Sequence, residues 1–119
     1  MPLKAYHEAQ RIAENPRSTE YRLFGQVTGA LIDAQREGKK GVGLIDAIDW
    51  NRRMWSTLAI DCMDEKNMLS RELKAQIVSL SIWVGKYSSQ VVRDNASIDP
   101  LIDVNRTVMQ GLATKPEAA

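Results

Sequence analysis

The residue types that most often carry catalysis or hold metal ions are scarce in this chain. One histidine, His7, and one cysteine, Cys62, stand far apart in the sequence. A zinc site needs three or four such ligands, and a Cys–His nucleophile pair needs a further group to orient it. Asp61, Asp64 and Glu65 lie close together, but their spacing fits no calcium-binding loop. The sequence therefore predicts a protein that is not an enzyme and that has no cofactor.

A glycine-rich stretch at residues 38–43 includes two lysines and is the nearest approach to a phosphate-binding loop. It lacks the spacing and the Gly-Lys-Ser/Thr ending of that motif, so it predicts a turn between helices. Arg36 precedes this turn, and Arg52 and Arg53 follow it. No aromatic stacking platform accompanies these basic residues, and the net charge of the chain is only +1. Composition and charge thus argue against direct nucleic-acid binding.

Two features of the composition concern the compartment. A single cysteine allows no disulfide within the chain, which favours a reducing environment. The longest strictly apolar run has three residues, for example residues 82–84, and this is far too short for a membrane span. We therefore expect a soluble cytoplasmic protein.

The elements that must position any site are helices, because the apolar residues recur with the 3.6-residue period of a helix and no segment alternates with a period of two. The pattern predicts an all-α fold, a compact bundle of four long helices plus a short N-terminal helix. It forms one domain over residues 1–119, and Ala113–Ala119 is expected to be a frayed tail. The expected helices cover residues 3–14, about 16–37, from about 44 or 46 to about 63, about 70–93 and about 99–112.

Helix boundaries are marked by residues that cap or open helices. Asn15-Pro16 and Asp99-Pro100 each place a capping side chain before a proline at the first helical position. Ser70 is a third candidate cap. Gly25 and Gly29 lie four residues apart in the second helix and are expected to let another backbone approach closely.

Two asparagines fall on the inward seams of the third and last helices. Asn51 lies among Leu44, Ile48, Trp55 and Leu58, which step by three and four residues. Asn105 occupies a similar position in the last helix. A buried amide must be hydrogen-bonded, so each is expected to bond a neighbouring helix and fix its register. The alternative is that one of them lies in a groove and binds the backbone of a partner.

Four residues are candidates for contact with a partner: Trp50, Met54, Ile82 and Trp83. Trp50 is offset by one residue from the seam that holds Asn51, and Trp83 lies off the main seam of its helix. That helix is apolar on two sides, which predicts a central position or a partner that covers it. Exposed aromatic and methionine side chains suit the binding of a partner helix. The alternative is that another helix of this bundle covers them.

The order and spacing of these residues resemble the FlaF-type flagellar biosynthesis regulators of bacteria over about residues 3–112. The central element is Asn51-Arg52-x-x-Trp55, which is similar to the family's Asn-Arg-x-x-Trp signature, and the closing helix contributes Leu101-Ile102 with Asn105-Arg106. Ser70 stands where the family often has proline, and either residue can begin a helix. The remaining matches are Ala5-Tyr6, the run from Asn15 to Glu20, Asp61, Leu69, Leu73, Ile77, Leu80, Val84 and Gly111-Leu112.

The resemblance implies a protein without enzymatic activity that binds flagellin in the cytoplasm as a secretion chaperone and helps to couple flagellin synthesis to export. The terminal helices of flagellin are the expected ligand, since amphipathic helices suit capture in an apolar groove. An alternative is post-transcriptional control of flagellin expression through an FlbT-type partner or flagellin mRNA. A third is a structural adaptor or dimer, so the oligomeric state stays open.

Overall fold

The computed structural model describes residues 16–38 and 40–113. Within these residues the chain forms four helices and no strand: α2 (Pro16–Arg36), α3 (Val42–Cys62), α4 (Arg71–Asp94) and α5 (Asp99–Ala113). The all-α class and the four long helices are confirmed. The expected N-terminal helix and the tail after Ala113 lie outside the described residues.

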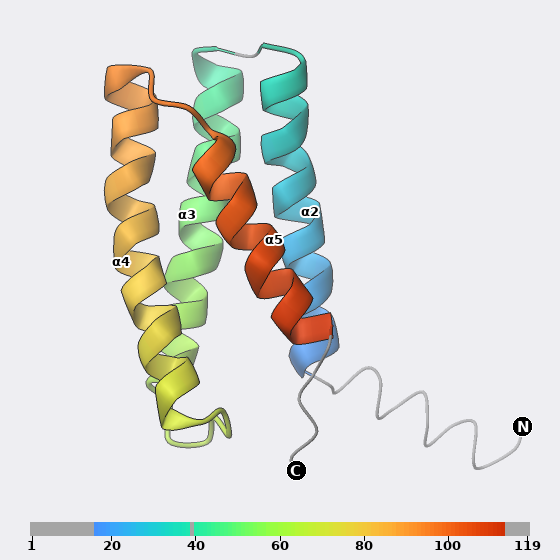
Figure 1. The fold of residues 1–119 in the computed structure, drawn as a ribbon, viewed down its shortest axis with the longest axis vertical. Coiled ribbons are helices and arrows are strands. Elements are labelled where there is room, and N and C mark those ends of the chain that lie inside the picture. Colours follow the sequence, from blue (N-terminus) through green and yellow to red (C-terminus); the bar gives the residue numbers. More distant parts are fainter. Residues whose placement is uncertain (1–15, 39, 114–119) are drawn as a thin grey trace, which may run out of the picture.

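The first three of these helices run up, down and up beside one another, and α5 crosses them obliquely (Figure 1). It begins at the end of α4 and finishes beside the start of α2. Helix α3 is central, with α2 packed on one side and α4 on the other, whereas α5 packs mainly against α2 and touches α4 only slightly. Connections of four to eight residues enforce the antiparallel order of neighbouring helices.

The start and end of α4 follow from local chemistry. The Ser70 hydroxyl accepts a hydrogen bond from the Leu73 backbone N–H at 3.1 Å, as expected of a helix cap. At the other end Asn95 adopts a left-handed conformation with φ 59°, and Ala96 N–H bonds back to the Gln90 carbonyl. This is the arrangement that closes many helices.

Two other helix starts differ slightly from expectation. Helix α3 begins at Val42, two residues before the earlier of the two predicted starts (Leu44 or Asp46), because Gly41 turns the chain with φ 60° and needs no side-chain cap. Helix α5 begins at Asp99 itself, and the Ser97 hydroxyl accepts the Asp99 N–H at 3.1 Å. The side chain that was expected to cap this helix instead accepts a hydrogen bond from the Gln35 amide of α2.

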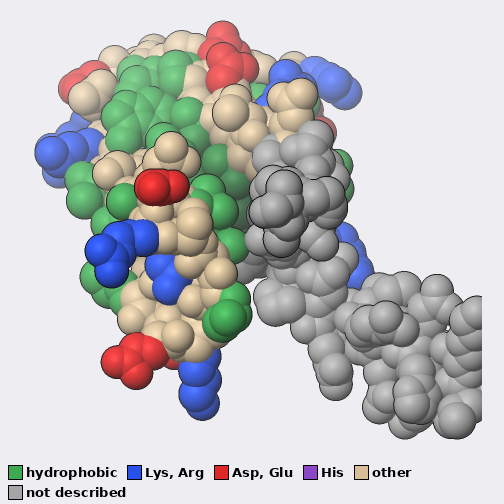
Figure 2. Space-filling view, turned by 60° about the horizontal axis from the view of Figure 1, so that its bottom comes forward, with side chains coloured by type: hydrophobic (Ala, Val, Ile, Leu, Met, Phe, Trp, Pro, Cys, Tyr) green, Lys and Arg blue, Asp and Glu red, His purple; other side chains and the backbone are tan. Residues whose placement is uncertain are grey.

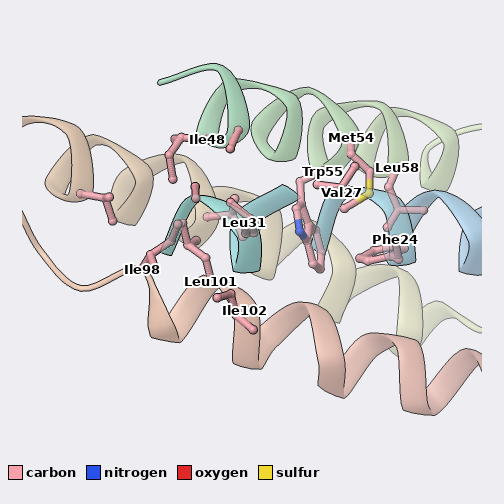
Figure 3. Packing of buried hydrophobic residues seen from close by; sticks show 14 of the residues in the cluster. Phe24, Val27, Leu31, Ile48, Met54, Trp55, Leu58, Ile98, Leu101 and Ile102 are labelled. Carbon is pink, nitrogen blue, oxygen red and sulfur yellow. The ribbon is translucent and has the colours of Figure 1, made fainter. Parts of the chain in front are cut away.

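The core lies where α2, α3 and α5 converge (Figure 3). Trp55 is fully buried at its centre, and the Phe24 ring meets it edge-on with centroids 5.4 Å apart. Leu31, Ile48 and Leu101 are also fully or almost fully buried. Edge-to-face contact and complete burial of large apolar side chains dominate the stabilisation of such a core.

No backbone of the described residues approaches the two glycines of α2 closely, contrary to the expectation from the sequence. Among these residues, a Cβ atom at Gly29 would meet nothing within 4 Å, and one at Gly25 would meet the Met109 Cε at 3.7 Å. The second distance is an ordinary contact with a flexible side chain.

Candidate partner-binding surface

Two of the predicted partner-binding residues lie on α3 with different exposure. Trp50 is 39% exposed, whereas Met54 is 5% exposed and packs in the core. The Arg52 guanidinium donates to the Ser89 hydroxyl at 3.4 Å, so the flank of α3 that carries Arg52 faces α4. Trp50 precedes Arg52 by two residues, about 200° around the helix, and therefore faces away from α4.

The other two predicted residues lie on α4. Ile82 is 57% exposed, and it lies seven residues before Ser89, on the same flank of α4. Trp83 is half-buried and stacks on Tyr87, with ring centroids 5.1 Å apart and planes 13° apart. The Tyr87 hydroxyl donates to the Ser97 carbonyl at 2.6 Å, which ties this aromatic pair to the connection between α4 and α5.

The structure therefore does not bring the four residues together on one face. Trp50 lies on the flank of α3 away from α4. Ile82 lies on the flank of α4 that carries Ser89 and adjoins α3, and Trp83 stacks on Tyr87, which bonds the α4–α5 connection. Exposed apolar surface is available at Trp50 and Ile82, but a single partner helix would not cover both.

A chain of buried amides joins α3 to α5. The Trp55 indole N–H donates to Asn105 Oδ1 at 2.9 Å, and Asn105 Nδ2 donates to Asn51 Oδ1 at 2.8 Å. Both asparagines are 0% exposed. These bonds fix the level of α5 against α3, because each amide has its partner only in this register. Neither asparagine is open to a partner.

The hydrogen bonding of this buried polar group is incomplete near α4. Asn51 Nδ2 and the Ser88 hydroxyl are buried without a hydrogen-bond partner among the described residues. Ser88 is 0% exposed and was not singled out from the sequence, because a lone serine in a helix carries no pattern of its own. Orphan polar groups of this kind reduce the net stabilisation that the amides provide.

The arginines in and beside the family motif lie in different positions. Arg53 forms an exposed ion pair with Asp49 at 2.7 Å, one turn away. Arg106 is exposed on α5. Arg52 is half-buried against α4. These contacts spread the basic residues of the motif over several faces.

The turn between α3 and α4 exposes further apolar side chains that the sequence analysis did not select. Met63 is 75% exposed and Met68 is 92% exposed, and Ile60 is 67% exposed in the last turns of α3. Figure 2 looks onto this end of the bundle and shows hydrophobic side chains among charged ones. Methionines in a connection show no helical period, so periodicity alone could not identify them.

Neither a metal site nor a membrane span is found in the described part of the chain. Residues 16–38 and 40–113 contain no group of three or more histidine, cysteine or acidic side chains placed to hold a metal ion. No helix within the same ranges is long and apolar enough to cross a bilayer.

These observations define a small all-α bundle. Its core contains the hydrogen-bonded series Trp55–Asn105–Asn51, and apolar residues are exposed on α3, on α4 and in their connection. Comparison with known families then identifies it further. The family model for flagellar protein FlaF matches residues 2–112, and the chain belongs to the FlaF family. No curated protein and no solved structure gives a significant match.

Proposed function

We propose that this protein binds flagellin in the cytoplasm, as a secretion chaperone, and helps to couple flagellin synthesis to export. Membership of the FlaF family supports a flagellar role. The observation that carries the finer proposal is Ile82, which is 57% exposed and lies seven residues before Ser89, on the flank of α4 where that serine bonds Arg52 of α3. An apolar residue in this position suits an amphipathic client helix, such as those at the ends of flagellin.

The proposed anchors are Ile82 and Trp83 on α4, with Trp50 as a separate contact on α3. Loss of the Ile82 side chain removes apolar area worth about 1–2 kcal/mol of binding, which is roughly a tenfold increase in Kd. Trp50 faces away from α4. If the client contacts both α3 and α4, the replacement of Trp50 is therefore expected to raise Kd independently of replacements on α4.

Calorimetric titration of flagellin with matched isoleucine variants tests this proposal. Ile82→Ala is expected to raise Kd about tenfold, whereas Ile60→Ala, at an isoleucine that is 67% exposed in the last turns of α3, is expected to leave Kd unchanged. The double variant Trp50→Ala/Trp83→Ala is expected to weaken binding while circular dichroism shows unchanged helix content. Unchanged affinity in both the Ile82 and the double variant would contradict the assignment.

Regulation of flagellin expression through an FlbT-type partner or flagellin mRNA is the alternative. Direct RNA contact draws little support from the basic residues, since Arg52 bonds Ser89 and Arg53 pairs with Asp49. A salt series separates the two, because phosphate contacts weaken steeply with salt and apolar helix capture does not.

A further inference from the structure

One face of α4 is exposed along most of the helix. Helix α4 forms an edge of the bundle, with α3 beside it and only slight contact with α5 (Figure 1). Its buried residues share one side of the helix: Ile77, Val84, Ser88 and Val91. A helical projection places six exposed residues within about 120° on the opposite side: Glu72, Ala75, Gln76, Ser79, Ile82 and Lys86. We call these six residues the exposed α4 face. Ile82 lies at its border nearest α3.

The middle of the exposed α4 face is uncharged and hollowed. Lys74 is the one other charged residue between Glu72 and Lys86, and the helical projection places it outside this face. Ile82 is 57% exposed. One turn before Ile82 there is a hollow of about 400 Å³, lined in the described part of the chain by Ala75, Gln76, Ser79 and Leu80. A partner that fits here presents an apolar side chain to the hollow and small, uncharged side chains around it.

The charges at the two ends of this face have opposite signs and are equally far from its middle. Glu72 lies seven residues before Ser79, and Lys86 lies seven residues after it. Seven residues make almost two helical turns, so each charge lies about 10 Å along the axis from Ser79 and on the same face. Neither Glu72 nor Lys86 forms an ion pair with another described residue. The face is therefore complementary in charge to a second copy of itself that runs in the opposite direction.

Antiparallel pairing also matches the apolar positions. When the two-fold axis passes near Ser79, Glu72 of each copy lies level with Lys86 of the other. Ile82 of each copy then lies level with the hollow of the other, against the small side chains of Ala75 and Ser79. Opposite charges beside a seam between helices set the choice and orientation of the partner. A parallel pair would instead place like charges together at both ends.

We propose that two copies of this chain pair through the exposed α4 face, antiparallel and with the two-fold axis near Ser79. The contact is a single pair of helices over about two heptads, which is small for an interface and predicts a weak dimer that depends on concentration. This inference does not rest on the binding of flagellin. Because Ile82 is also a proposed anchor for flagellin, pairing of two copies and capture of flagellin compete at this face.

Sedimentation velocity of the full-length chain at low salt, from micromolar to millimolar concentration, tests the pairing. The unaltered chain is expected to pass from monomer to dimer over this range. Glu72→Lys and Lys86→Glu are each expected to raise the Kd of the dimer about tenfold, because two attractive charge pairs become repulsive. Arg106→Glu, at an exposed arginine of α5, is the charge-matched control and is expected to leave Kd unchanged. A chain that stays monomeric throughout, or a dimer whose Kd either α4 substitution leaves unchanged, would overturn the proposal.

A mixture of the two α4 variants tests the antiparallel direction. In Glu72→Lys both ends of the face are basic, and in Lys86→Glu both ends are acidic. Each variant alone repels its own copy, but a mixed pair again has opposite charges at each end. The mixture is therefore expected to dimerise as tightly as the unaltered chain, and a mixture no tighter than the separate variants would contradict the pairing.

A disulfide cross-link locates the two-fold axis. In a Cys62→Ala background, Ser79→Cys is expected to give a covalent dimer under mild oxidation, because the two substituted positions face each other at the axis. Gln90→Cys, exposed on the same helix, is the control and is expected to stay monomeric, since its two copies would lie about 33 Å apart along the axis. Absence of the Ser79→Cys cross-link, or equal cross-linking of both variants, would overturn this placement of the axis.

Discussion

Exchange of each buried asparagine for leucine should have very different effects on stability. In Asn105→Leu, the Trp55 indole N–H and the Asn51 carbonyl oxygen both lose their partner in the core, since Asn105 serves both. Each orphaned buried group costs about 1–3 kcal/mol, so the free energy of unfolding should fall by roughly 2–6 kcal/mol. That loss is a large part of the stability of a typical domain.

Asn51→Leu should be far milder. It orphans Asn105 Nδ2, but it also removes Asn51 Nδ2, which is already buried without a partner among the described residues. One orphaned amide nitrogen replaces another, so the net change from hydrogen bonding should stay within about 1 kcal/mol. Both variants gain the same volume, so the strain from a larger side chain applies to each and largely cancels in the comparison.

The assay is urea unfolding followed by circular dichroism, with the double variant Asn51→Leu/Asn105→Leu included. Among the groups of the Trp55–Asn105–Asn51 series, the double variant leaves only the Trp55 N–H without a partner, and it should therefore be more stable than Asn105→Leu alone. Two results would refute this account of the buried amides. One is an equal loss of unfolding free energy in Asn51→Leu and Asn105→Leu, and the other is a double variant that is less stable than Asn105→Leu.

Substitutions at four further positions follow from backbone, capping and hydrogen-bond geometry, and each is measured as the free energy of unfolding. Gly85→Ala should stabilise the protein by about 0.5–1 kcal/mol, because a Cβ there meets nothing within 4 Å among the described residues, and destabilisation would contradict this open space. Gly41→Ala should destabilise the protein by about 1 kcal/mol because φ is +60°. Ser70→Ala should cost about 1 kcal/mol through loss of the α4 cap, and Ser70→Asp should restore it. Tyr87→Phe should cost about 1 kcal/mol by removing the bond to the Ser97 carbonyl, and no change would show that this bond adds nothing to stability.

Much of the fold could be predicted because local signals decided it. The Ser70 cap is confirmed, and the core positions follow the three- and four-residue steps of the sequence. The early start of α3 was missed because it depends on a positive φ at Gly41, which no side chain announces. The role of Asp99 was also misjudged, because its carboxylate bonds Gln35 of the neighbouring helix α2, which is 64 residues away in the sequence.

The candidate surface was harder to predict, because it depends on how helices cross rather than on their own periodicity. The pattern of α3 alone could not tell that Met54 is buried while Trp50 is partly exposed. The oblique path of α5 decides which side of α4 is left open, and this path follows from its packing on α2. The amide pair was expected on inward seams, but its mutual bonds require both helices at their observed levels.

The proposed binding of flagellin is tested most directly by mixing the purified protein with monomeric flagellin from the same source and measuring the mass of the mixture by size-exclusion chromatography with light scattering. The account predicts a stable complex at micromolar concentration that is lost when flagellin lacks its terminal helices. Two separate peaks with full-length flagellin, or a complex that persists without the terminal helices, would contradict it.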